Sequence, residues 1–193
     1  MEIQLFAAEL ERPLTDEEAD ALLRLMPEER RARARNAKAR QEPLLAYALL
    51  SEAARQLWGW ASLPRLGYGK NGKPFFPAHP EAQFSISHTR RAVLVGLHDE
   101  PLGVDIERLR PVSERVMRRV ADTTSQQAFF AYWVRREARS KRDGTGIVSL
   151  REPETLPPDG ERVIPLDIFP DCAACLCTRS AAPVAPVQIR IIR

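Results

Sequence analysis

Two carboxylates stand two residues apart in an apolar run near the middle of the chain, Asp105 and Glu107 in Leu-Gly-Val-Asp-Ile-Glu-Arg at 102–108. Successive side chains of a β-strand point to opposite faces, so both acids share one face while Val104 and Ile106 face a core. Like charges on a half-buried strand repel each other and are costly to desolvate unless a cation neutralises them. Because Mg²⁺ prefers oxygen ligands, the pair is a candidate metal site. The alternative is that an isolated Asp-x-Glu is only the exposed face of an edge strand.

A second group of chemically capable residues lies on a long predicted helix. Trp133, Glu137 and Lys141 are spaced by four, so they share one helix face. A glutamate in reach of a substrate hydroxyl can act as a general base, and a nearby lysine can hold phosphate. Read alone, the same spacing is an ordinary surface salt bridge worth a few tenths of a kcal/mol.

The elements that must position these residues follow in a mixed order. The capping-box pair Thr15 and Glu18 begins one predicted helix, and a glycine at 144 ends another. We expect helices at 15–26, 28–40, 43–58, 112–121 and 125–142. We expect strands at 2–10, 163–169, 172–178 and 187–192, and an antiparallel meander of strands at 82–88, 92–98 and 101–107. This order indicates an α+β fold.

Bulk composition excludes several classes of protein. Of 193 residues, 44% are hydrophobic and 28% charged, which is typical of a globular protein, and no apolar run could span a membrane. The first residues lack a signal-peptide pattern, so we expect a cytoplasmic protein without a membrane partner. The net charge of +3 is mild. Arginine clusters at 30–40 and 135–142 could be solvated helix faces or an RNA surface, but the first has no interleaved aromatics, so we expect no nucleic-acid partner.

The three cysteines are Cys172, Cys175 and Cys177, all close to the C-terminal end of the sequence. An odd number in a chain without a leader argues against a disulfide framework. We therefore expect them to be small apolar residues of a buried strand.

Four motifs occur together in one order along the chain. They are Gly-Lys-Pro at 72–74, Ile-Ser-His-Thr at 86–89, Gly-Val-Asp-Ile-Glu at 103–107, and Trp-x-x-Arg-Glu-Ala-x-x-Lys at 133–141 followed by Gly-x-Gly-Ile at 144–147. In these motifs the chain resembles the 4′-phosphopantetheinyl transferases, particularly the surfactin-synthetase-activating type. If these residues had only unrelated structural roles, the four motifs would not be expected to occur in the family's order and with its spacing.

The resemblance implies both a fold and a reaction. It implies two similar α/β lobes, here 1–108 and 109–193, related by a pseudo-twofold axis with the active site in the cleft between them. It implies transfer of the 4′-phosphopantetheine arm of coenzyme A to a serine of an acyl or peptidyl carrier protein, with release of 3′,5′-ADP and dependence on Mg²⁺.

The resemblance also implies residue roles. Metal ligands would be Asp105, Glu107 and Glu137, and Glu137 would also be the general base. Matching positions for contacts to coenzyme A are Lys73, Ser87, His88 and Lys141, with Arg31 and Arg35 placed by region only, near the 3′-phosphate.

The chain departs from the family pattern between the two acidic motifs. The segment from 108 to 132 is short and lacks the usual Phe-Phe-x-x-Glu element that helps to receive the carrier protein, and Arg136 replaces a lysine. The alternative is therefore a non-catalytic relative that binds coenzyme A or a carrier protein. The carrier, the pathway, the use of acyl-coenzyme A, the choice between Mg²⁺ and Mn²⁺ and the oligomeric state are not fixed by the sequence.

Overall fold

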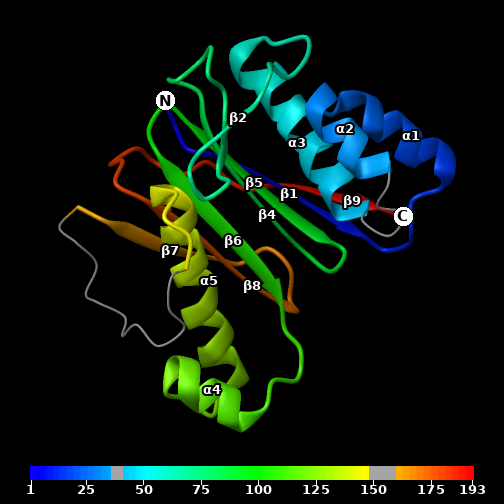
Figure 1. Cartoon of the computed structure of the whole chain (residues 1–193). Helices are drawn as coiled ribbons and strands as arrows, with labels where there is room; N and C mark the ends of the chain where they lie inside the picture. Colours follow the sequence, from blue (N-terminus) through cyan, green and yellow to red (C-terminus); the bar gives the residue numbers. More distant parts are fainter. Residues whose placement is uncertain (36–40, 148–159) are drawn as a thin grey trace.

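Two of the three β-sheets in the described part of the chain pack face to face, and helices cover the outer side of each (Figure 1). The computed structural model describes residues 1–35, 41–147 and 160–193, with the backbone alone at 32–35. Its helices are α1 (Asp16–Leu25), α2 (Glu28–Arg35), α3 (Gln41–Trp58), α4 (Glu114–Ala121) and α5 (Gln126–Asp143). Its strands are β1 (Gln4–Leu10), β2 (Gly67–Tyr68), β3 (Pro74–Phe75), β4 (Gln83–Thr89), β5 (Ala92–His98), β6 (Leu102–Arg108), β7 (Arg162–Leu166), β8 (Cys172–Thr178) and β9 (Gln188–Ile192). The fold is α+β, as the sequence predicts.

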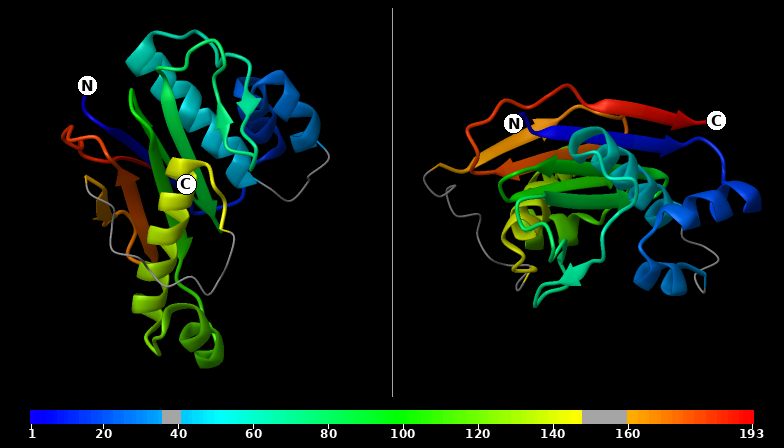
Figure 2. Two further views of the ribbon diagram at one scale, coloured as in Figure 1. Left: turned by 60° about the vertical axis from the view of Figure 1, so that its left-hand side comes forward. Right: turned by 90° about the horizontal axis from the view of Figure 1, so that it is seen from above.

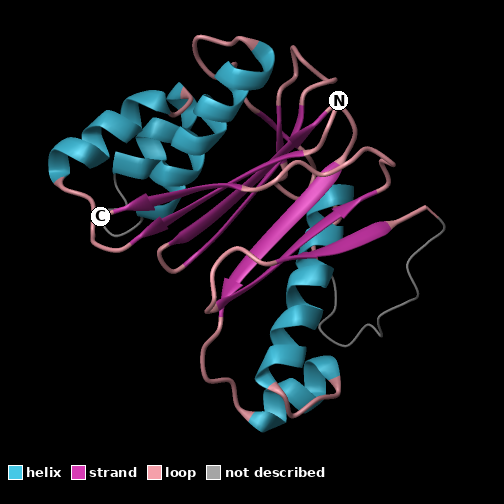
Figure 3. Cartoon of the chain, turned by 180° about the vertical axis from the view of Figure 1, so that it is seen from behind, coloured by secondary structure: helices cyan, strands magenta, loops and turns pink. Residues whose placement is uncertain are grey.

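The larger sheet has the strand order β4-β5-β1-β9. β4, β5 and β1 are antiparallel neighbours, and β9 joins β1 in parallel, so the last strand pairs with the first (Figure 2). Helices α1 and α3 cover the outer face of this sheet (Figure 3). β5 is buried along its whole length because helices cover one of its faces and the second sheet covers the other.

The smaller sheet, in the order β6-β8-β7, lies against the inner face of the larger one. Val104 and Ile106 of β6 pack there against Leu5 and Leu94 of the larger sheet. Alternation along β6 therefore turns Gly103, Asp105 and Glu107 toward the opposite face, where α5 lies. This is the orientation of the two acids that the sequence predicts.

Helix α5 lies directly on the backbone of β6 at Gly103. A Cβ atom at this position would stand 1.9 Å from the carbonyl oxygen of Ala138 and 2.4 Å from the amide nitrogen of Arg142. Only glycine permits this approach. The glycine of the Gly-Val-Asp-Ile-Glu motif thus sets how closely the helix bearing Glu137 approaches the strand bearing Asp105.

Local signals in the sequence are confirmed at the ends of the helices. The capping box of Thr15 and Glu18 is present at α1, and the hydroxyl of Ser125 caps α5 by accepting a bond from the Ala128 amide. Gly144 ends α5 with φ +67°, a conformation that favours glycine. All three cysteines are free thiols in β8, which confirms the expectation of a strand without disulfides.

The predicted three-stranded meander is wrong in its third strand. β4 and β5 form a hairpin, but β6 pairs with β8 in the other sheet. The physical reason is that β5 has no free edge, because β1 occupies its second side. β6, which ends at residue 108, therefore belongs to the sheet of the C-terminal strands, and β9 belongs to the sheet of the N-terminal strands. The boundary at 108 stays a prediction.

A short hairpin of β2 and β3 projects beside α5, with the Asn71-Gly72 turn at its tip. Gly72 has φ +81° there, as expected for this tight turn. Among the described residues, none of the helices combines the length and the hydrophobicity that crossing a bilayer requires.

Candidate active site

Asp105 lies at the centre of the site, buried between β4, β6 and α5, with 3% of its surface exposed. Its Oδ1 accepts hydrogen bonds from the Ser87 hydroxyl at 2.7 Å and from the Lys141 ammonium at 2.7 Å. Its other oxygen, Oδ2, is buried and has no hydrogen-bond partner in the described part of the chain. A buried carboxylate oxygen without a partner is costly, and a metal ion is the kind of group that satisfies it. The donor set at this position therefore fits a hard cation.

Glu107 of β6 and Glu137 of α5 are near Asp105 and are half-buried. Burial raises the pKa of Glu137, the negative charges of Asp105 and Glu107 raise it further, and Lys141 opposes this only in part. The three carboxylates therefore feel one another, and a shared cation would relieve their repulsion. One oxygen taken from each of the three carboxylates never gives a set that lies within 4.8 Å of one another. The acids are therefore neighbours, but they are too far apart in this structure to share one ion.

Lys141 connects helix to strands. Besides Asp105, its ammonium donates to the Ser87 hydroxyl at 2.8 Å. Glu137 and Lys141, one turn apart on α5, are both turned toward the β6 acids, as their spacing predicts. The structure thus brings together Asp105, Ser87, Glu137 and Lys141 from β6, β4 and α5.

A cavity of about 270 Å³ opens beside these residues. Lys73, Glu137 and Lys141 line it, together with the hairpin turn at Asn71 and Gly72 and the residues that follow α5. The cavity has cationic side chains and one carboxylate on its walls. It can therefore receive an anionic ligand next to a potential base.

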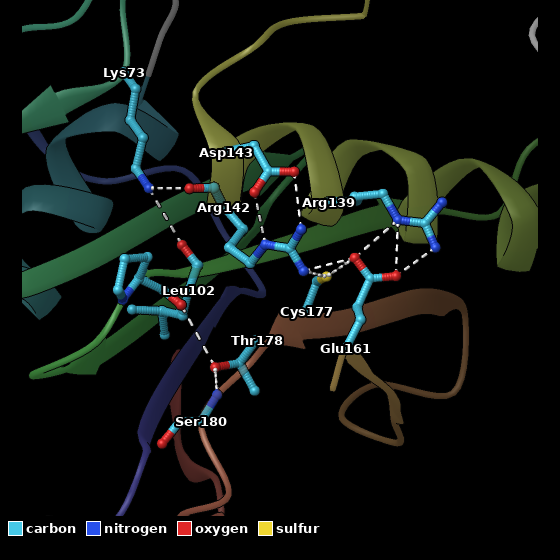
Figure 4. A network of polar contacts seen from close by, with 10 residues as sticks. Lys73, Leu102, Arg139, Arg142, Asp143, Glu161, Cys177, Thr178 and Ser180 are labelled. Atoms are coloured by element: carbon cyan, nitrogen blue, oxygen red, sulfur yellow. Dashed lines mark hydrogen bonds and ion pairs between the residues drawn. The ribbon is translucent and has the colours of Figure 1, made fainter. Parts of the chain in front are cut away.

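Lys73 lies in the wall of this cavity, in the turn just before β3, but turns its ammonium toward backbone oxygens. Nζ donates to the carbonyl of Arg142 at 2.9 Å and to that of Leu102 at 3.4 Å (Figure 4). Burial lowers the pKa of Lys73, and the nearby Asp143 counteracts this in part. The lysine therefore ties the hairpin to the C-terminal end of α5 in this structure.

Asn71 makes a second tie at the same place, and the sequence reasoning missed it. Its amide donates to the carbonyls of Gly144 and Thr145 at 2.9 and 2.8 Å. These carbonyls follow the last turn of α5, where helix geometry leaves acceptors unpaired. The Asn-Gly signal located the turn, but nothing in the sequence showed what the asparagine side chain would contact.

The remaining expected contact residues, Arg31, Arg35 and His88, are not among the described residues that line the cavity. Arg31 donates to the carbonyls of Met26 and Arg24, each at 2.7 Å, at the C-terminal end of α1. Arg35 ends α2, and its side chain lies outside the described residues. His88 is exposed, and strand alternation turns it to the face of β4 opposite Ser87.

Behind α5, a buried ionic network fastens the helix to the second sheet (Figure 4). The Glu161 carboxylate is fully buried and accepts bonds from Arg139 at 2.6 Å and from Arg142 at 2.6 Å. Arg142 also contacts the thiol of Cys177 on β8. Sequence reasoning missed this network, because Glu161 is 19 residues from its second partner and no local pattern marks it.

Comparison with known proteins gives related sequences. No family model matches the chain. The 4′-phosphopantetheinyl transferase Sfp of Bacillus subtilis strain 168 is 27% identical over 161 residues, which are 75% of this chain and 72% of that protein. The 4′-phosphopantetheinyl transferase psf-1 of Bacillus pumilus is 29% identical over 147 residues, 62% of each protein. The 4′-phosphopantetheinyl transferase HetI of Nostoc sp. is 30% identical over 108 residues, 47% of this chain and 46% of HetI.

Proposed function

We propose that this chain, which belongs to the 4′-phosphopantetheinyl transferase superfamily, transfers the 4′-phosphopantetheine arm of coenzyme A to a serine of an acyl or peptidyl carrier protein. The products are the loaded carrier and 3′,5′-ADP. The observation that carries the proposal is the meeting of Asp105, Glu137 and Lys141 beside one cavity, with an unpartnered oxygen on Asp105. A site of this kind could catalyse several reactions, and we select this one because the chain is similar in sequence to the transferases.

The three carboxylates would hold Mg²⁺. Asp105 would offer Oδ2, and Glu107 and Glu137 would each offer an oxygen after a small approach of their side chains. When bound, the ion would neutralise charge that develops on the diphosphate as the bond to phosphorus breaks.

Glu137 would take the proton from the carrier serine as its hydroxyl attacks the phosphorus. Its carboxylate suits this role because it lines the cavity, where a hydroxyl of a second substrate could come within hydrogen-bond reach. Lys141 can contact the diphosphate from the next turn of α5, and Lys73 can reach the same cavity from the turn that precedes β3. These cations favour an anionic ligand by simple charge complementarity.

The remaining coenzyme A contacts stay predictions of the resemblance. Arg31 and His88 would have to turn toward the ligand from their present positions, and Ser87 would have to give up bonds that it makes now. Arg35 is kept as a candidate near the 3′-phosphate. The expected cytoplasmic location, with neither membrane nor nucleic acid as partner, is also kept as a prediction.

The two-lobe arrangement is part of the same proposal. Each sheet carries one 18-residue helix on its outer face, α3 on the larger sheet and α5 on the smaller, which supports two similar units. The division at residues 108 and 109 would then separate them in sequence, with β6 and β9 each crossing to the other unit's sheet.

Mass spectrometry of carrier proteins tests the proposal. The protein is incubated with coenzyme A, Mg²⁺ and a panel of apo-carriers, and the mass of each carrier is measured. A carrier should gain the phosphopantetheine mass, and the same carrier with its acceptor serine changed to alanine should not. A protein that binds no coenzyme A under these conditions would contradict the proposal.

The alternative, a relative that binds without catalysis, has one observation in its favour. Between β6 and α5 the chain forms only the eight-residue helix α4, where the family is expected to receive its carrier. Tight binding of coenzyme A with no transfer to any carrier would select this alternative.

A further inference from the structure

We propose that Ser87 and Thr89 are positioning residues, whose hydroxyls hold the two carboxylates of β6 in the orientation that binds the metal. The inference rests on the proposed function, because it deepens the account of the same site. It assigns Ser87 to the acids in place of the contact with coenzyme A that the family resemblance implies.

The hydroxyls belong to a ladder that joins the two sheets. β6 is the edge strand of the smaller sheet, and its free edge faces the inner side of β4. Three side-chain hydroxyls at every second position of β4 accept bonds from three backbone N–H groups at every second position of β6. The pairs are Ser85 with Val104 at 3.0 Å, Ser87 with Ile106 at 3.3 Å, and Thr89 with Arg108 at 3.2 Å. Side chains thus complete an edge that no strand pairs.

Two of the three hydroxyls make a second bond, to a carboxylate. Ser87 donates to Oδ1 of Asp105 at 2.7 Å, and Thr89 donates to Oε2 of Glu107 at 3.2 Å. The equivalent residue beside Ser85 is Gly103, which has no side chain. Ser87 and Thr89 are two residues apart on β4, and Asp105 and Glu107 are two residues apart on β6, so each hydroxyl lies beside one carboxylate.

Hydrogen-bond capacity gives Ser87 its role. A hydroxyl has one donor and two acceptor positions. Ser87 gives its proton to Asp105 and accepts from the Ile106 amide and from Lys141, and only 4% of the residue is exposed. No bonding position is left for a phosphate oxygen of a ligand.

The orientation of Asp105 follows from these bonds. Ser87 and Lys141 both bind Oδ1, which leaves Oδ2 as the oxygen without a partner. At Glu107, Thr89 and Arg110 both bind Oε2 in the same one-sided manner. Hydrogen bonds to one oxygen of a ligating carboxylate fix where the other oxygen points, and loss of such a partner typically lowers metal affinity about 10- to 100-fold.

Three variants separate this role from a general role in joining the sheets. Ser87→Ala and Thr89→Val remove a ladder bond and a carboxylate bond, whereas Ser85→Ala is the matched control that removes a ladder bond alone. Binding of Mn²⁺ to the full chain with coenzyme A present is followed by the loss of the free-ion electron paramagnetic resonance signal. Thermal unfolding and the KM for coenzyme A at saturating Mg²⁺ are measured beside it.

We expect Ser87→Ala and Thr89→Val to weaken Mn²⁺ binding about tenfold or more, while Ser85→Ala binds Mn²⁺ like the wild type. All three should unfold at lower temperatures, and Thr89→Ser should restore Mn²⁺ affinity because it restores the hydroxyl. The KM for coenzyme A at saturating Mg²⁺ should stay unchanged in Ser87→Ala.

Two results would overturn the inference alone. One is a raised KM for coenzyme A in Ser87→Ala with normal Mn²⁺ affinity, which would mean a direct phosphate contact. The other is an equal loss of Mn²⁺ affinity in Ser85→Ala and Ser87→Ala, which would mean a general loosening of the joint. A wild-type chain that binds neither coenzyme A nor Mn²⁺ would overturn the proposed function, and the inference with it.

Discussion

At the scale of single residues, the proposed transfer reaction depends on three acids and one lysine whose electrostatic surroundings differ. Asp105 is buried and is paired with Lys141, whose ammonium lies 2.7 Å from Oδ1 and serves as its direct counterion. Glu137 is half-buried, and its pKa is raised by burial and by the charges of the other two acids, which Lys141 opposes in part. The acids therefore differ in their surroundings: Asp105 has a direct counterion, whereas Glu137 carries a repulsion that a cation shared by the three acids would relieve.

Glu137→Gln tests the base directly. The amide keeps the size of the side chain but cannot take a proton, so we expect transfer to a carrier to fall on the order of 10²- to 10⁴-fold. Rates are measured by the appearance of loaded carrier in mass spectra. The control is Glu114→Gln on α4, an exposed glutamate paired with Arg118, which should leave the rate unchanged. A Glu137→Gln rate within threefold of the wild type would exclude this residue as the base.

At the scale of elements, the site exists because α5 lies on β6 without an intervening side chain. The contact at Gly103 brings the helix close, and the ionic network of Arg139, Arg142 and Glu161 holds it against β8. The hairpin adds Asn71 and Lys73 at the end of the helix. The positions of Glu137 and Lys141 therefore depend on how α5 is held at three places: by β6, by β8 and by the hairpin.

Gly103→Ala is expected to displace α5. The added methyl would meet helix backbone at 1.9 Å, and backbone cannot give way as a flexible side chain can. We expect a loss of about 3 kcal/mol or more in the free energy of unfolding, with loss of transfer activity. Gly69→Ala is the matched control, because its nearest atom would be an ordinary 3.7 Å away. Equal stability of the two variants in urea unfolding would contradict the close contact.

Glu161 makes the ion pairs that hold α5 against the second sheet depend on pH. Burial alone would raise its pKa, but the bonds from Arg139 and Arg142 outweigh burial and hold the pKa below the usual 4.5. A carboxyl with a lowered folded-state pKa stabilises the fold above pH 4.5, and this stability is lost as the pH falls toward the folded-state value.

We therefore expect Glu161→Gln to lower the free energy of unfolding by about 3 kcal/mol at pH 7, because the buried Arg142 and the half-buried Arg139 each lose an ion pair with a buried carboxylate. The variant should also lose part of the decline in stability below pH 4.5 that the wild type shows. Urea unfolding from pH 3 to pH 7 measures both effects. Parallel curves for the two proteins would show that Glu161 has an ordinary pKa.

At the scale of the whole molecule, the sequence predicted local structure, but it did not predict which distant segments pair or contact one another. Helix ends, the Asn-Gly turn and the face shared by Asp105 and Glu107 follow from spacing alone, and all three are found. The transfer of β6 to the second sheet was not predicted, because it depends on β1 filling the second edge of β5. Alternation indicates which way a strand faces but not which strand lies beside it.

The same distinction holds within the site. The meeting of Glu137 and Lys141 with the β6 acids was predicted through the resemblance to a family, since nothing in local spacing places α5 on β6. The contacts of Ser87, Asn71 and Glu161 were not predicted, because each joins residues at least 18 positions apart. Such contacts form only once the sheets are stacked.

The central claim is that a metal ion held by acids of β6 and α5 meets the phosphates of coenzyme A. Isothermal titration of the wild-type chain with coenzyme A, once with Mg²⁺ and once with EDTA, tests it most directly. The account predicts markedly tighter binding with Mg²⁺, and a smaller difference between the two titrations in Asp105→Asn. Equal affinity of the wild type with and without the metal would contradict it.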